Sequence, residues 1–280
     1  NFYGGPTNTV TYKAAVGSEH NGLADSGVRL GADVGVHSST ALSINLPFQI
    51  FQGLVLISNG TNYANSVVTA TSTNRRYEGT RIKDCIISCS EGVDGYATRL
   101  DSGATDLPRG TEEYPIVFDN CVFLKTGIQT VRIGNGADSN VQFNNCTFGE
   151  GRVVGRVAAA IIDAGKTYKV SWTNCIRLGD GADVTYTPGS DITLIAGPSN
   201  LSLHTGASDN YWPGSLTYTA TTNTSASLTG SQMIYDPSTL ALINVSGNDA
   251  VGVGTGSAIN VPVTDILGNS RIRGASNEYV

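Results

Sequence analysis

Short runs of alternating apolar and polar residues recur along the first two thirds of the chain. One phrase reads IKDCII at 82–87, VFDNCVF at 117–123, VQFNNCTF at 141–148 and VSWTNCIR at 170–177. Alternation over a few positions is typical of a half-buried strand, because successive side chains of a strand point to opposite faces. In VQFNNCTF the pattern predicts that Val141, Phe143, Cys146 and Phe148 point inward around a turn at Asn144-Asn145.

The position that cysteine fills in this phrase defines a repeat. It is occupied by Leu54 in IFQGLVLI (50–57), and then at intervals of 31, 36, 25 and 29 residues by Cys85, Cys121, Cys146 and Cys175. A second strand-like phrase precedes the first in several units and reads GVRLGAD (27–33), ATRLDSG (97–103), TVRIGNG (130–136) and AIIDAG (160–165). Two strand-like phrases in constant order are what stacked coils would produce.

Composition agrees with a fold built of strands and turns. The chain of 280 residues has 34 Gly and one Met, and only 14% of it is charged, whereas its hydrophobic content of 40% is too high for a disordered chain. We therefore expect an all-β fold with a parallel β-helix, or solenoid, over residues 27–180. Residues 1–26 are expected to form an N-terminal cap or extension, and 181–280 further irregular coils or a less regular, β-rich capping domain.

The repeated Cys and Asn are interpreted as structural residues. Cysteine is small and usually buried, so it suits a tight interior stack. The residues before it would lie one above another at the strand spacing of about 4.8 Å, where stacked Asn side chains form hydrogen-bonded ladders. These residues are Asp84, Asn120, Asn145 and Asn174.

The Asn-Cys strand phrases resemble the right-handed parallel β-helix superfamily, which includes pectate-lyase-like proteins and phage tailspikes. The segment TDILGNSRIRGASNEYV at 264–280 is similar to the D-x-x-G-x-x-R motif that closes many such repeats, although the strand that usually follows is missing or altered. The resemblance implies a right-handed β-helix. It implies little about activity, because this fold carries lyases, hydrolases, adhesins and inert virion parts.

Two sets of charged residues are weak candidates for catalysis. Arg99 and Arg132 share a slot of the second phrase with Arg29, and a basic stripe on adjacent coils could recognise a glycan carboxylate or act as a lyase base. Asp101 and Asp163 fall one position apart in the aligned phrases and could form a carboxylate pair for glycoside hydrolysis. The preferred interpretation of both sets is structural, as a solvated face and as turn-forming aspartates.

Other candidate sites are weaker still. Tyr211 and Trp212 could stack on a sugar ring, but an aromatic cap over the end of the core is the preferred interpretation. Glu112 and Glu113 lie in the longest loop and are expected to be a solvent-exposed tip. The three His are far apart in sequence, and we expect no metal site and no cofactor.

Charge bears on the partners. The net charge of −6 and pI near 5.0 argue against nucleic acid, and no apolar run is long enough for a membrane span. We expect a non-enzymatic structural or adhesive protein of an extracellular or virion surface, such as a phage head-decoration, fibre or tailspike-like protein. Its partners would be other virion or surface proteins and a surface polysaccharide. A homotrimer fits the resemblance, because β-helix spikes often associate side by side. The alternative is a polysaccharide lyase or glycoside hydrolase acting on an extracellular glycan.

Overall fold

The computed structural model describes the chain in segments that contain strands, turns and bends and no helix. The described residues are 5–20, 23, 26–32, 40–58, 66–69, 77–89, 96–101, 110–126, 129–134, 139–150, 167–173, 175–177, 191–196, 201–204, 226–229, 254–255, 272–273 and 278–279.

Three parallel sheets make up most of the described fold. The first sheet contains, in spatial order, β1 (Val10–Lys13), β4 (Gln49–Gln52), β7 (Arg81–Lys83), β10 (Ile116–Asp119), β13 (Ser139–Asn144), β15 (Thr167–Thr173) and β17 (Asp191–Ala196). The second contains β2 (Arg29–Ala32), β5 (Val55–Ser58), β8 (Ile86–Cys89), β11 (Val122–Thr126), β14 (Thr147–Glu150), β16 (Ile176–Arg177), β18 (Leu201–His204) and β19 (Ala226–Thr229). The third contains β3 (Thr40–Ser43), β6 (Ser66–Thr69), β9 (Tyr96–Asp101) and β12 (Gln129–Gly134).

A small fourth sheet is antiparallel. It is formed by β20 (Gly254–Thr255), β22 (Glu278–Tyr279) and β21 (Ile272–Arg273), with β22 in the middle.

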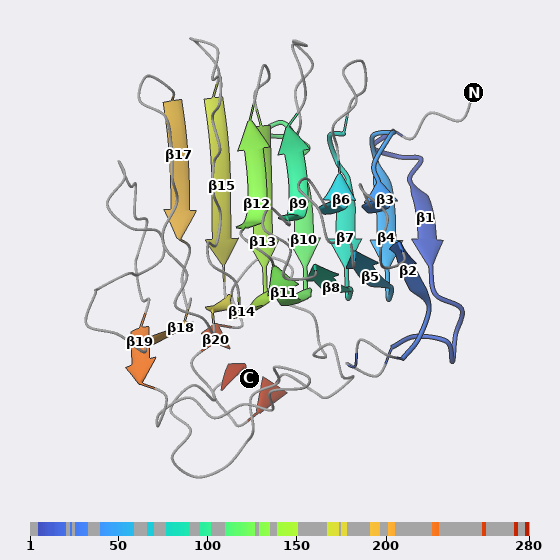
Figure 1. Ribbon diagram of the computed structural model, residues 1–280. Coiled ribbons are helices and arrows are strands. Elements are labelled where there is room, and N and C mark those ends of the chain that lie inside the picture. The colour runs from blue at the N-terminus through green and yellow to red at the C-terminus, as the bar shows by residue number, and fades with distance from the viewer. Residues whose placement is uncertain are drawn as a thin grey trace.

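The chain visits the three parallel sheets in rotation. It passes from β4 to β5 to β6, then from β7 to β8 to β9, then from β10 to β11 to β12, and we call each passage a round. Within a sheet, each strand therefore pairs with the equivalent strands of the neighbouring rounds, and the strands at the two edges have one neighbour. Figure 1 shows the first sheet laid out in chain order from blue β1 to orange β17. The prediction of an all-β fold with parallel strands is confirmed for the described residues.

One grouping of the sequence phrases is wrong. The sequence pattern predicts the same slot for Arg29 as for Arg99 and Arg132, but β2 pairs with β5 in the second sheet, where Arg29 lies opposite Val55. Arg99 and Arg132 lie in the third sheet. In the round that contains Arg29 the first-sheet strand is β1, and its sequence VTYK lacks the Asn-Cys signature. Without that signature, the sequence does not show that GVRLGAD follows a first-sheet strand and therefore belongs to the second sheet.

In the four rounds that begin with β4, β7, β10 and β13, a single left-handed residue turns the chain from the first sheet toward the second. This residue is Gly53, Asp84, Asn120 or Asn145, and its φ is 69°, 50°, 53° and 54° respectively. These values lie in the left-handed region, which Gly enters freely and which Asn and Asp tolerate better than other residues. The Asn and Asp of the repeated phrase are thus explained by backbone geometry at the corner.

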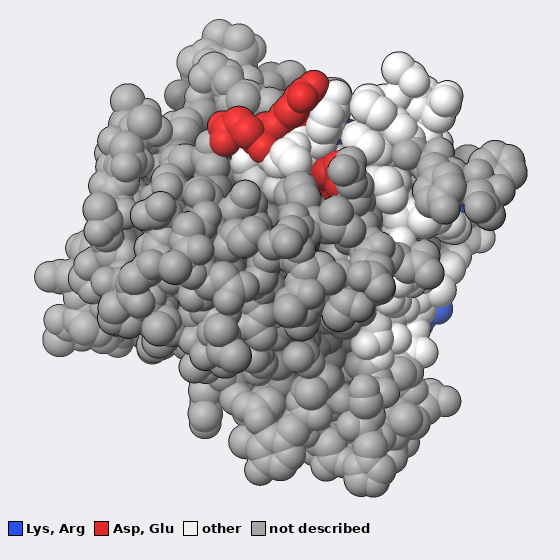
Figure 2. All heavy atoms as spheres, turned by 90° about the horizontal axis from the view of Figure 1, so that it is seen from above, with Lys and Arg blue, Asp and Glu red and all other residues white. Residues whose placement is uncertain are grey.

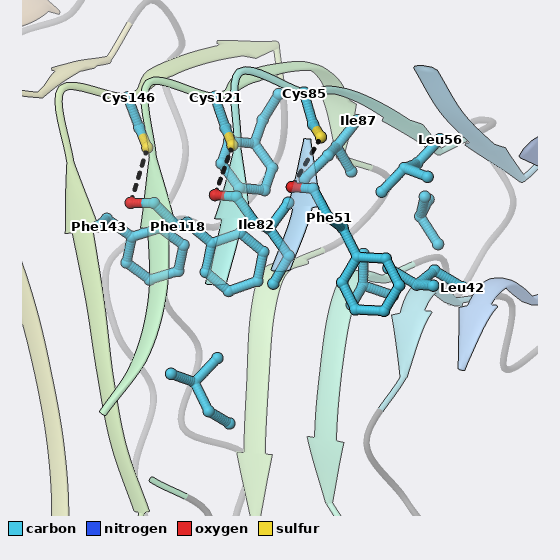
Figure 3. Packing of buried hydrophobic residues seen from close by; sticks show 14 of the residues in the cluster. Leu42, Phe51, Leu56, Ile82, Cys85, Ile87, Phe118, Cys121, Phe143 and Cys146 are labelled. Atoms are coloured by element: carbon cyan, nitrogen blue, oxygen red, sulfur yellow. Dashed lines mark hydrogen bonds between the residues drawn. The ribbon is translucent and has the colours of Figure 1, made fainter. Parts of the chain in front are cut away.

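Inward side chains form continuous columns because the strands are in register. Phe118 stacks on Phe143 with ring centroids 5.0 Å apart, and Phe123 stacks on Phe148 at 4.8 Å, in both cases with the rings 16° from parallel. Figure 3 shows the first-sheet column, whose members Phe51, Ile82, Phe118 and Phe143 are all buried. Fully burying one such side chain contributes about 1.5–3 kcal/mol. The inward positions predicted for VQFNNCTF are confirmed.

Asn120 allows a test of the corner. Asn120→Val should destabilise the fold by about 1–3 kcal/mol through left-handed strain and by about 1–3 kcal/mol more because Asp84 loses a donor. Asn120→Gly should lose only the second contribution. Chemical denaturation of both variants measures the difference, and equal stability of the two would show that the left-handed backbone is not a constraint here.

Candidate functional site

The polar side chains of the corners bond to one another between rounds. Asn120 Nδ2 donates to Asp84 Oδ1 at 2.7 Å, and Gln52 Nε2 donates to Asp84 Oδ2 at 2.9 Å. Asn145 Nδ2 donates to Asp119 Oδ1 at 3.4 Å. The predicted ladder is therefore confirmed between Asn120 and Asp84, while Asn145 also uses the acid that precedes the corner. Asn174 lies outside the described residues.

The backbone continues this ladder. The amide of Asp84 donates to the Asp119 carbonyl at 3.0 Å, and the amide of Asn120 donates to the Asn144 carbonyl at 2.9 Å. On the N-terminal side, His20 Nε2 lies 2.7 Å from the Asp84 carbonyl, which requires the proton to be on Nε2. The segment that carries His20 also passes over Gly53, where a Cβ would contact Glu19 and Ala14. The N-terminal segment is thus attached to the first corners of the stack.

Asp119 is a buried acid, with 3% of its surface exposed. Burial raises the pKa of this carboxyl, and the nearby Lys83 and Arg81 and the hydrogen bond from Asn145 offset the effect only in part. A carboxylate with a raised pKa is sometimes a general acid or base. Here, however, Asp119 lies directly before the corner residue Asn120 and accepts a hydrogen bond from the corner residue Asn145, so its role is structural.

The thiols one residue after the corners form a second ladder, made of Cys85, Cys121, Cys146 and Cys175. Each lies within hydrogen-bonding distance of a carbonyl of the preceding round, at the residue three positions before the equivalent slot. In Cys85, Cys121 and Cys146 the single S–H proton is shared with the carbonyl two residues earlier in the same round, at 3.1, 3.4 and 3.3 Å. The distances are 3.7 Å from Cys85 to Phe51, 3.3 Å from Cys121 to Ile82, 3.5 Å from Cys146 to Phe118 and 3.4 Å from Cys175 to Phe143. Figure 3 shows the first three of these bonds in a row.

The chemistry available to the thiols is limited by their burial. All five cysteines are free and buried. Burial raises the pKa of Cys85 and Cys146 well above the usual value and raises the pKa of Cys89 to about 12. The thiolate is the nucleophile and the metal ligand, so these environments suppress both reactions. The interpretation of the cysteines as packing residues is confirmed.

The candidate arginines are brought together in the third sheet. Arg132 of β12 lies directly opposite Arg99 of β9, and Gly134 lies opposite Asp101. Thr98 and Leu100, on either side of Arg99, are buried. The predicted adjacency of Arg99 and Arg132 on neighbouring strands is therefore confirmed for their backbones. Asp163, Tyr211 and Trp212 lie outside the described residues.

The loop that precedes β10 contains two exposed acidic residues on a hydrogen-bonded turn. Glu112 and Glu113 are exposed, as predicted, and Figure 2 shows acidic side chains projecting on the face seen from above. The Thr111 amide donates to the Tyr114 carbonyl at 3.0 Å, and the Tyr114 amide donates to Thr111 Oγ1 at 2.9 Å. Hydrogen bonding to Glu113 raises the pKa of the Tyr114 phenol. The Tyr114 ring meets Phe48 edge-on at 5.1 Å, so the turn rests on the core.

Two further searches concern the described part of the chain alone. No group of three or more His, Cys, Asp and Glu side chains is placed there so that it could hold a metal ion. Nor does that part contain a helix with the length and hydrophobicity needed to cross a membrane. Comparisons of the chain with protein-family models, with curated proteins and with solved structures find no match.

Buried thiols should not react in the folded protein. We expect a thiol reagent such as DTNB to leave all five cysteines unmodified under native conditions and to modify all five in guanidinium, because burial disfavours the thiolate. Ser18→Cys, at an exposed position, is the control and should react at once in the folded chain. Rapid native modification of the five original cysteines would contradict their burial.

Asp119 should make stability depend on pH. Its folded-state pKa lies above the unfolded-state value of about 3.9, so its unfavourable contribution is absent below about pH 4 and grows as the pH rises through the folded-state pKa. Asp119→Asn removes the charge and keeps an acceptor for Asn145. The unfolding midpoint of Asp119→Asn, relative to that of the original chain, should therefore rise as the pH increases from 4 to 7.

The exposed Glu113→Gln is the control for this comparison and should show no such trend. A midpoint difference for Asp119→Asn that stays constant with pH, or that falls as the pH rises, would contradict the raised pKa.

Proposed function

We propose that this chain is a right-handed parallel β-helix that serves as a non-enzymatic structural or adhesive protein on a virion or cell surface. The architecture supports the fold proposal, because successive rounds add one strand to each parallel sheet in register. Handedness comes from the resemblance and from the general rule that parallel crossover connections are right-handed.

One observation carries the functional part of the proposal. The most repeated residues of the chain are used to join one round to the next. Asn120 bonds to Asp84, Asn145 to Asp119, and each described repeat thiol to a carbonyl of the preceding round. Repetition of this kind builds a stiff body with a long side surface, which is the property that a surface fibre, decoration or spike requires.

The partners follow from the same proposal. A long side surface suits association with other virion or surface proteins, with a surface polysaccharide, or with two further copies side by side as a homotrimer. The location would be extracellular or on the virion. The exposed acids on the loop before β10 belong to the surface available for such contacts.

A polysaccharide lyase or glycoside hydrolase is the second candidate. It is favoured by the direct opposition of Arg99 and Arg132 in the third sheet, with Asp101 two residues after Arg99 on the same strand. Neighbouring cations of this kind could bind the carboxylates of an anionic glycan.

Incubation with a panel of anionic and neutral polysaccharides separates the two candidates. We expect no new reducing ends and no rise in unsaturated-uronate absorbance. Cleavage that is lost in the double variant Arg99→Ala/Arg132→Ala and kept in Arg29→Ala would overturn the non-enzymatic proposal. Arg29 is a matched control because it is an exposed arginine on a different sheet.

Antibody labelling tests the location independently. Gold-labelled antibodies against the chain should mark the surface of intact particles or cells of the source, and light scattering of the purified protein should give its assembly state. Antigen confined to the interior of the cell would overturn the surface role.

A further inference from the structure

The buried interior contains oxygens that no described protein group satisfies. They include Gln49 Oε1, Thr80 Oγ1, Thr98 Oγ1 and Asn140 Oδ1. A buried polar atom without a partner costs free energy comparable to a lost hydrogen bond, so native proteins satisfy nearly all of them with protein groups, water or an ion. The amide oxygens of Gln49 and Asn140 only accept, so the group that satisfies them must bring hydrogens or positive charge, whereas the threonine hydroxyls can donate or accept.

Two of these oxygens come from adjacent rounds. Ile50 of β4 lies opposite Arg81 of β7, so the residues just before them, Gln49 and Thr80, also face each other at the strand spacing of about 4.8 Å. Gln49 is 6% exposed and Thr80 is fully buried. In the rounds that follow, the same inward position is filled by Ile116 and Val141. The polar pair is thus an interruption of an apolar column.

One water molecule can reach two side chains that lie opposite each other on adjacent strands. Two hydrogen bonds of about 2.8 Å at a tetrahedral oxygen span about 4.5 Å. Water donates two hydrogens and can therefore serve both an amide oxygen and a hydroxyl oxygen. We propose that an internal water molecule bridges Gln49 Oε1 and Thr80 Oγ1 and joins the rounds of β4 and β7. This inference does not depend on the proposed function.

A cation is the competing ligand. Amide and hydroxyl oxygens also bind metal ions, and Glu78, buried two residues before Thr80, could supply negative charge. Water is favoured because the described residues contain no cluster of acids around the pair that would compensate a buried ion.

Thr80→Val tests the bridge, because valine keeps the shape of threonine and removes the hydroxyl. If water bridges the two side chains, removing the hydroxyl takes away one of the two groups that hold this water. Gln49 Oε1 then loses its donor, and the unfolding midpoint should fall by about 2–4 °C. If the hydroxyl is truly without a partner, the same change should raise the midpoint, and the proposal is overturned. Thr11→Val, at an exposed position of β1, is the matched control and should change the midpoint little.

Magnetic relaxation dispersion of water provides a direct readout that does not rely on stability. It should count one fewer long-lived internal water in Thr80→Val than in the original chain and no loss in Thr80→Ser, which keeps the hydroxyl. An unchanged count in Thr80→Val overturns the proposal. So does a midpoint of the original chain that falls with EDTA or when sodium is replaced by choline, since that dependence assigns the site to a cation.

Discussion

The stack depends on one constraint, which is the left-handed backbone conformation of a single residue at each corner between the first and second sheets. Gly53 meets it by lacking a Cβ, and Asp84, Asn120 and Asn145 meet it as side chains that tolerate positive φ. Because two residues, the first of them left-handed, separate the strands at each of these four corners, the strands on either side keep the same phase from one of these rounds to the next. The phenylalanine rings therefore stack on one another, and the thiols meet equivalent carbonyls.

The corner also explains the unusual interior chemistry beside it. The residue after the corner is an apolar side chain that can be buried, and where it is cysteine its S–H group also reaches a carbonyl of the preceding round, as Cys121 reaches Ile82. Asp119, just before a corner, is held in an environment that opposes its charge and is stabilised in part by Lys83 and Arg81. Structural necessity therefore produces perturbed acids and thiols in this chain, which elsewhere would suggest catalysis.

The sequence predicts the parts of the fold that repeat. Alternation identifies the inward residues of VQFNNCTF, and the Asn-Cys signature identifies the corners, because both result from local backbone geometry. The pairing of β2 with β5 was not predictable, since an Arg-Leu-Gly phrase fits a strand in any sheet and only the order of strands within the round assigns it. Gln49 was also missed as an interior residue, because a polar side chain at an inward position carries no periodic signal.

For the candidate site, the sequence predicts that Arg99 and Arg132 are neighbours, and the register of β9 and β12 confirms it. A catalytic role would also require acidic or basic side chains from segments far away in the sequence to lie beside these arginines. The spacing of residues along the sequence does not give the distances between such side chains in space. Asp101 lies two residues after Arg99 on the same strand, so its nearness to Arg99 in the sequence is the stronger reason to consider it than its alignment with Asp163.

The constancy of the corners contrasts with the distances between them. Successive corners are separated by 25 to 36 residues, whereas the path from the inward residue of the first sheet to the slot after the corner is three residues long in each of the four rounds that begin with β4, β7, β10 and β13. Insertions and deletions are therefore absorbed in the connecting loops, where doubling the length of a loop costs only about 0.6 kcal/mol. The loops can therefore change in length and sequence under selection while the core stays in register. Proteins descended from one such chain could acquire different binding specificities without losing the fold at any step.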